Sequence, residues 1–268
     1  MTPETYMRRY HTGCREEELL TAEELFPACP LTTTEVEAAG CSCLKAAPEP
    51  APTCCCKASM VEALRLLCNA ELATLVDFDS FFFLTSTLAV GGSLTVPAAG
   101  ADNISGLEAS FQRFSPCNCD LIDVGGSAYF TTPGATTLAL EEVEQLSLRS
   151  VKALAFGLTL PTEPEETEAT VYRRALRHLR RAIQANGGTV SGCGSCGAHC
   201  DYDNCCCDEG LLAELATRNL SRLATLGVGP LILRNVTVLG SVGSALILAD
   251  ETLRRIYFVC VSQVEALG

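Results

Sequence analysis

The sequence predicts an α+β protein that is mostly antiparallel β-sheet, with two repeated helix–strand–strand units and an Arg-rich helix linking them. Three observations support this prediction: an internal repeat that begins at two cysteine triplets, β-branched runs separated by glycine-containing turns, and one long amphipathic segment between the repeats. At 268 residues the chain is long enough to bury a sizeable core in one or two domains.

The internal repeat aligns residues 54–96 with residues 205–247 without a gap. The triplet Cys54-Cys55-Cys56 falls on Cys205-Cys206-Cys207, and the tetrapeptide Leu-Ala-Thr-Leu occurs at both 72–75 and 223–226. A match of this length is typical of a duplicated structural unit. We therefore expect each triplet to open the same unit of one helix and two strands.

Each copy begins with a short predicted helix, at 57–69 and at 208–220. In the first helix, Met60, Leu64, Leu67 and Cys68 fall on one face, so Cys68 is expected to be a small buried hydrophobe. Strand-like runs and turns follow. The predicted strands cover 75–90, 92–96, 121–131, 230–239, 244–248 and 255–264, the last of which would bury Cys260. Residues 136–160 are ambiguous, since their acidic cluster favours helix and 147–160 alternates like a strand.

The segment 162–185 is the clearest predicted helix. Glutamates crowd its start and arginines fill its later turns, which suits the helix dipole, and Asn186-Gly187-Gly188 is a suitable end. A buried stripe is expected from Val171, Ala175, Leu179, Ala182 and Ile183. The arginines either form a solvated face or dock an acidic surface on a sister subunit.

Four parts of the chain are expected. Residues 1–53 form an N-terminal extended arm with a Pro-rich linker, residues 54–160 the first repeat unit with extra strands, residues 161–204 the linking helix and a Cys-rich loop, and residues 205–268 the second repeat unit.

Composition excludes several classes of partner. A net charge of −13 argues against nucleic acid, because phosphate binding needs a basic surface. No apolar run approaches the roughly 18 residues that a membrane span requires. The first residues contain charge and no apolar signal core, so we expect synthesis in the cytoplasm without a signal peptide.

The 17 cysteines conflict with a cytoplasmic origin, because disulfides are rare in reducing compartments. Either the thiols bind metal, or they oxidise later and between subunits once the environment changes. An odd number of cysteines also cannot pair fully within one chain.

The cysteine triplets favour crosslinking. Adjacent Cα atoms lie about 3.8 Å apart, below the roughly 4.4–6.8 Å of a relaxed disulfide, so neighbouring cysteines do not bridge each other without strain. In an extended run the middle thiol points away from its neighbours, which suits bonds to several segments. The predicted crosslinking cysteines are Cys14, Cys29, Cys41, Cys43, Cys54, Cys55, Cys56, Cys117, Cys119, Cys205, Cys206 and Cys207.

A metal site is the alternative interpretation. Cys193, Cys196, His199 and Cys200 have a spacing that zinc or an iron–sulfur cluster accepts, and the second triplet would complete the coordination. This alternative describes a metal-binding module with a redox role and zinc as its cofactor. The leading interpretation needs no cofactor.

Catalytic signatures are absent from the sequence. No nucleophile elbow, zinc-protease motif, Walker loop or dinucleotide-binding glycine loop occurs, and Cys193–Cys196 lacks a surrounding thioredoxin-like pattern. Asp77 and Asp79, like Asp201 and Asp203, are better explained as polar turns than as cation ligands. We therefore expect a protein that is not an enzyme.

A family resemblance agrees with this expectation. Cys54–Cys56 with the following Lys57-Ala58-Ser59-Met60, the Cys193–Cys207 cluster and the closing Tyr257-Phe258-Val259-Cys260 resemble cysteine-rich spore-surface proteins of clostridia and bacilli, which include coat, exosporium and spore-appendage subunits. The resemblance implies synthesis in the mother cell and oxidation when that cell lyses. The expected function is a self-assembling structural subunit of a filament, ribbon or lattice at the spore surface. Its partners would be copies of itself, crosslinked by disulfides, and other cysteine-rich surface proteins.

Overall fold

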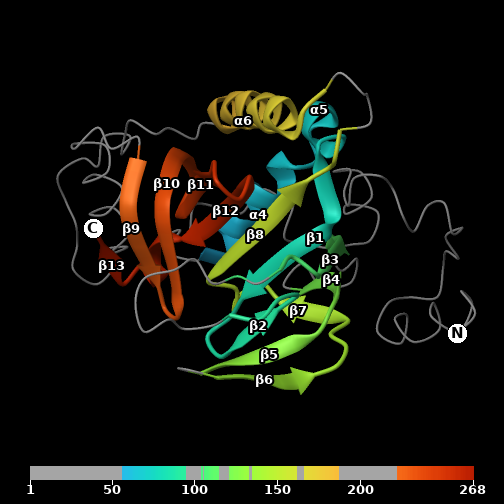
Figure 1. Cartoon of the computed structure of the whole chain (residues 1–268), viewed down its shortest axis with the longest axis vertical. Helices are drawn as coiled ribbons and strands as arrows, with labels where there is room; N and C mark the ends of the chain where they lie inside the picture. The colour runs from blue at the N-terminus through green and yellow to red at the C-terminus, as the bar shows by residue number, and fades with distance from the viewer. Residues whose placement is uncertain are drawn as a thin grey trace, which may run out of the picture.

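The main sheet of the protein has ten strands, in the order β13-β9-β10-β11-β12-β8-β1-β2-β5-β6, and every pairing in it is antiparallel (Figure 1). A small sheet of three strands, in the order β3-β4-β7, lies beside β1. The structure is a computed structural model that describes residues 56–94, 104, 106–114, 121–132, 135–161, 166–186 and 222–268. The predicted α+β class with mostly antiparallel sheet is confirmed.

The strands have the following bounds. They are β1 Val76–Leu84, β2 Leu88–Val90, β3 Ser110–Phe114, β4 Leu121–Gly125, β5 Ala128–Thr132, β6 Ala135–Leu140, β7 Gln145–Ser147, β8 Ala153–Leu158, β9 Arg222–Val228, β10 Leu231–Val242, β11 Ala245–Asp250, β12 Arg255–Cys260 and β13 Ala266–Leu267. A 3₁₀ turn, η2, covers Val261–Gln263.

The centre of the main sheet is apolar on both faces. Along β12, Phe258 belongs to one buried cluster while its neighbours Tyr257 and Val259 belong to the other, because successive side chains of a strand point to opposite faces. Phe156 in β8 lies on the face of Phe258, with ring centroids 5.3 Å apart. Strands apolar on both faces must be covered on both faces, so these strands occupy the middle of the sheet.

Strands from the two predicted repeat units share this one sheet. β12, from the C-terminal part, pairs with β8 from the first part, in a register that runs from Ile256 opposite Phe156 to Val259 opposite Ala153.

Helices cover one face of the main sheet. They are α4 Cys56–Leu66, α5 Ala70–Ala73 and α6 Glu168–Ala185. Met60 and Leu64 of α4, together with Leu179 and Ile183 of α6, join the same buried cluster as Phe258. The helix predicted at 57–69 forms as α4 but ends at Leu66, and the helix predicted at 208–220 lies outside the described residues.

The linking helix forms as predicted but is shorter at its start. Its first residue is Glu168, and the side chain of Thr167 caps it by accepting a hydrogen bond from Thr170 N at 3.3 Å. Thus Glu166 precedes the helix rather than lying in its first turn. The whole predicted stripe is buried, together with Tyr172, and Asn186 caps the end.

Residues 141–144, whose glutamates favour helix, form no helix in the structure. Val143 is buried and its N–H donates to Gly126 O at 2.8 Å, so this segment is an irregular connection between β6 and β7. Tertiary hydrogen bonding overrides the local helix propensity here.

The two copies of Leu-Ala-Thr-Leu have different structures. The copy at 72–75 lies in α5 and the turn after it, whereas the copy at 223–226 lies in β9 and pairs with β10. Asn69 explains the difference, because its side chain caps α5 by accepting from Glu71 N at 3.0 Å and the aligned residue is Leu220. At these positions the sequence repeat is therefore not a structural repeat.

One buried carboxylate joins the three strands of the small sheet. Asp123 in β4 is buried and accepts hydrogen bonds from Arg113 Nε in β3 and from Gln145 Nε2 in β7, each at 2.9 Å. Because both partners satisfy the carboxylate, the charge is tolerated inside the protein.

A buried hydrogen bond fixes α4 to the β10–β11 turn. Ser59 Oγ accepts from Ser244 N at 2.8 Å. The preceding residue, Gly243, has φ +52, and a Cβ there would lie 2.5 Å from Ser59 Oγ. Glycine is needed both for the left-handed backbone and for the close approach of the helix.

We expect Gly243→Ala to destabilise the protein more than Gly229→Ala does. Gly229 also has a positive φ (+56), but a Cβ there would lie 3.8 Å from its nearest neighbour, so this control isolates the backbone effect of about 1 kcal/mol. At Gly243 the methyl group would also displace Ser59 from Ser244, which costs about 1–3 kcal/mol more. Urea unfolding of both variants measures the difference, and equal midpoints would contradict this account of the α4 contact.

Candidate functional site

The predicted crosslinking cysteines lie outside the described residues, with one exception. Cys56 is the first residue of α4. The predicted metal ligands Cys193, Cys196, His199 and Cys200 also lie outside the described residues. The described part of the chain therefore begins at the last cysteine of the first triplet, and it shows how helix α4 is held in the fold.

Helix α4 is packed against the main sheet. Met60, Ala63, Leu64 and Leu67 of α4 and its following turn are fully buried, and α4 contacts β10, β11 and β12. Together with the Ser59 hydrogen bond, this packing fixes the direction of the helix that Cys56 opens. The chain entering α4 from the triplet thus meets the core at a defined place.

Two further cysteines lie close to α4, and each is disulfide-bonded. Cys68 follows the helix and is half-buried, so the expected full burial is wrong for it. Cys260 is fully buried, as predicted, and its strand partner Ala245 adjoins Ser244, which holds the first turns of α4. The sequence predicted Cys68 on the buried face of this helix and Cys260 in a buried strand. The fold decides that Cys260 also lies near α4.

Within the described residues, no group of three or more His, Cys, Asp or Glu side chains is placed to hold a metal ion. Asp77 and Asp79 lie in strand β1, so the predicted polar turn is wrong at this position. Asp77 accepts hydrogen bonds from Asp79 N at 3.1 Å and from Ser80 Oγ at 2.7 Å, where the pairing of β1 with β8 is irregular between Asp77 and Phe81. Across the same part of the chain, no helix is long and apolar enough to cross a membrane.

Helix α6 forms one end of the molecule in Figure 1, and three side-chain contacts join it to neighbouring segments. Glu168 in its first turn pairs with Arg254 from the β11–β12 turn. His178 Nδ1 lies 2.5 Å from Glu71 Oε2 in α5, and Arg174 lies 2.8 Å from Glu166.

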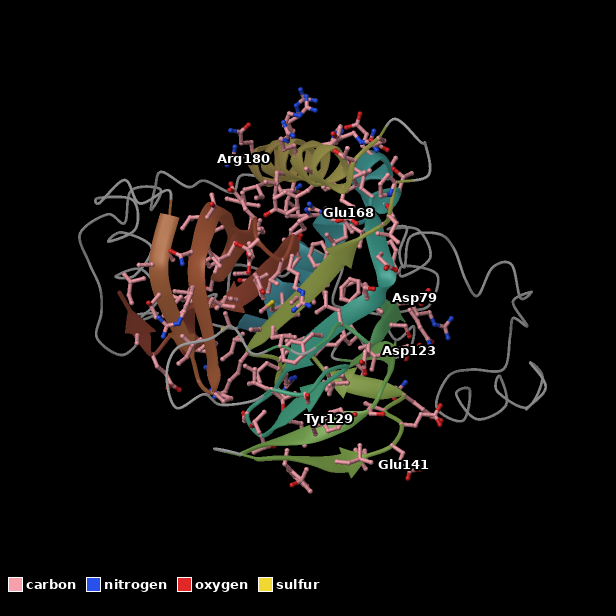
Figure 2. All side chains as sticks on the ribbon, in the orientation of Figure 1. Asp79, Asp123, Tyr129, Glu141, Glu168 and Arg180 are labelled. Atoms are coloured by element: carbon pink, nitrogen blue, oxygen red, sulfur yellow. The ribbon has the colours of Figure 1, made fainter. Side chains whose placement is uncertain are left out.

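The remaining arginines of α6 face outward. Arg173, Arg177, Arg180 and Arg181 are exposed, while the opposite face of the helix is buried. In Figure 2, side chains with nitrogen at their tips extend outward from α6, where Arg180 is labelled. An exposed basic face on a protein of net charge −13 is a candidate docking surface for an acidic partner.

Beneath this basic face, Tyr172 is buried with a hydroxyl that has no hydrogen-bond partner among the described residues. Burial, and then the nearby carboxylates of Asp250 and Glu251, raise the pKa of Tyr172 above its ordinary value. An unpaired buried hydroxyl costs about 1–3 kcal/mol.

At the opposite end of the molecule, the β5–β6 hairpin exposes large apolar side chains. Phe130, Leu138 and Leu140 are 47%, 48% and 51% exposed. β6 is the edge strand of the main sheet. Sequence reasoning missed this surface because apolar residues in a strand normally indicate burial.

Comparison with known proteins gives one family. Residues 54–268 match the family described as spore coat protein CotA-like. The chain is also similar to spore coat protein CotA of Clostridioides difficile strain 630, with 31% identity over 269 residues that cover 80% of this chain and 83% of the relative. No solved structure matches the chain.

We expect Tyr172→Phe to be at least as stable as the wild type at neutral pH, because the change removes an unpaired hydroxyl. Above about pH 10 the unfolded phenol ionises while the folded one does not, so the wild type loses stability. The stability advantage of the variant should then grow by about 1.4 kcal/mol per pH unit.

Urea unfolding between pH 7 and 11 measures this difference, with Tyr129→Phe, at a half-buried position, as the control. A difference between Tyr172→Phe and wild type that stays constant with pH would show that Tyr172 ionises in the folded protein.

Proposed function

Because the chain belongs to the spore coat protein CotA-like family, we propose that it is a structural spore-surface subunit that assembles with copies of itself and is locked by disulfides between subunits. The observation that carries the proposal is that the family match begins at Cys54, the first cysteine of the triplet that leads into α4. We propose no enzymatic activity for this subunit.

The arrangement at α4 supports a crosslinking role. The packing of α4 fixes the point at which the thiol run joins the folded subunit, which would reduce the entropy lost when that run bonds to a neighbour. Adjacent cysteines bridge each other only under strain, so the run is better suited to several separate partners.

Timing of oxidation would control assembly. A subunit made in a reducing cytoplasm keeps its thiols free, and release of the spore exposes them to oxidant. Crosslinks formed then would hold each subunit to its neighbours and would restrict unfolding, because a crosslinked chain has fewer unfolded conformations. The proposed form of the assembly is a filament, ribbon or lattice.

We expect purified protein, reduced and then oxidised in air, to form ladders on non-reducing gels that collapse to monomer with reductant. Replacing Cys54, Cys55 and Cys56 together by serine should shift the ladder towards smaller species, since one anchor of each subunit is lost. Mass spectrometry of peptides under non-reducing conditions identifies the cysteines that join two chains.

Cys117→Ser with Cys119→Ser is the comparison variant, which keeps both triplets. A ladder unchanged by loss of the first triplet would remove that triplet from the crosslinking set. A monomer with no intersubunit disulfide after oxidation would contradict the proposed function itself.

A further inference from the structure

We propose that subunits associate head to tail before any disulfide forms, with the basic face of α6 on one copy contacting the acidic β5–β6 end of the next copy. This inference rests on the proposed function, since it describes the non-covalent contact that would bring thiols together. The two surfaces are defined here as the basic end and the acidic end. The basic end is made of Arg173, Arg177, Arg180 and Arg181. The acidic end is made of Glu141 and Glu142 with the apolar side chains Leu138 and Leu140, which lie on one face of β6.

The basic end is a single continuous stripe. Its four arginines are spaced i, i+4, i+7 and i+8, which places them on one face of a helix, and all four are exposed. The ion pairs of Arg174 with Glu166 and of Arg254 with Glu168 neutralise neighbouring basic groups, so the stripe is distinct from the rest of the helix surface. Helix packing holds it in place, because Val171, Ala175 and Leu179 are buried beneath it.

The acidic end is equally well fixed. Glu141 and Glu142 directly follow β6 and are exposed. Their backbone is held from both sides, because Ser127 Oγ donates to Glu141 O at 2.8 Å and Val143 N donates to Gly126 O at 2.8 Å. The exposed Leu138 and Leu140 adjoin these carboxylates in sequence.

The two ends lie at opposite ends of the longest axis of the molecule. In Figure 2, where that axis is vertical, Arg180 is near the top and Glu141 is at the bottom. Their contact must therefore join different surfaces of two copies, and repeating it extends an open chain rather than closing a dimer. A two-fold dimer through either end alone would place like charges against each other, which opposes that arrangement.

The choice of a second copy as the partner follows from charge. The chain has net charge −13, so most of the surface of another copy is expected to be acidic. The basic stripe would be attracted to such a surface. Surface ion pairs contribute only about 0.2–1 kcal/mol each, so the contact needs the apolar surface of the hairpin as well. We therefore expect weak, salt-sensitive association that disulfides would make permanent.

A charge swap tests the contact in the full-length protein under reducing conditions. One variant carries Arg173→Glu, Arg177→Glu, Arg180→Glu and Arg181→Glu, which makes the basic end acidic, and the other carries Glu141→Arg with Glu142→Arg. Sedimentation velocity at low salt should show concentration-dependent association of the wild type, and monomer for each variant alone. An equal mixture of the two variants should associate again, because every contact in the mixture then joins opposite charges.

Two controls make the result specific. Glu62→Arg with Glu265→Arg changes the net charge as much as the Glu141 and Glu142 swap does, at exposed positions outside both ends, and should leave association intact. Association of the wild type should also fall in about 1 M salt, where the screening length is about 3 Å. Circular dichroism confirms that each variant is folded.

The inference is overturned if the reduced wild type stays monomeric at low salt, or if folded variants fail to associate when mixed. If the variant with the arginines replaced is monomeric but the variant with Glu141 and Glu142 replaced still associates, the acidic surface that the stripe binds lies elsewhere. That result would also overturn the inference. None of these results decides whether intersubunit disulfides form, which the oxidised ladder measures separately. A wild type that is monomeric when reduced but polymerises on oxidation would thus reject this contact and keep the proposed function.

Discussion

The pairing of β12 with β8 is the constraint on which the rest of the structure depends. It joins the last part of the chain to the part before α6, and its strands are apolar on both faces. Burying both faces of such strands requires neighbours on each side within the sheet and cover above and below it. The helices supply that cover on one face, which is why α4 and α6 have fixed positions.

This arrangement determines what the surface of the protein offers. Because α4 is held against β10–β12, the chain that leads from the first triplet reaches the core at one place. Because α6 buries one stripe, its arginines are left on the outside. At the far end of the sheet, β6 has no further strand beyond it among the described residues, and its apolar side chains stay exposed. These are the two surfaces that the proposed contact between copies would use.

Some elements were predictable because local sequence is enough to specify them. The amphipathic spacing of Met60 and Leu64, and of Val171 and Leu179, gave α4 and α6 in nearly the right places. The run from Arg255 gave β12 because it is β-branched and aromatic. Most predicted crosslinking cysteines lie outside the described residues, so those assignments stay predictions. The bonded Cys68 and Cys260 were assigned only to packing, because no local pattern shows which segments meet in the fold.

The sequence by itself determined the α+β class, the cysteine triplets, the basic stripe and the resemblance to spore-surface proteins, because composition and periodicity are local properties. Only the tertiary structure decided that Leu-Ala-Thr-Leu is helix and turn at 72–75 but strand at 223–226, and that the glutamates after β6 form an irregular connection. It also decided that the arginines and the exposed hairpin lie at opposite ends of the molecule. Each of these depends on hydrogen bonds and packing between segments far apart in the chain, which no local pattern records.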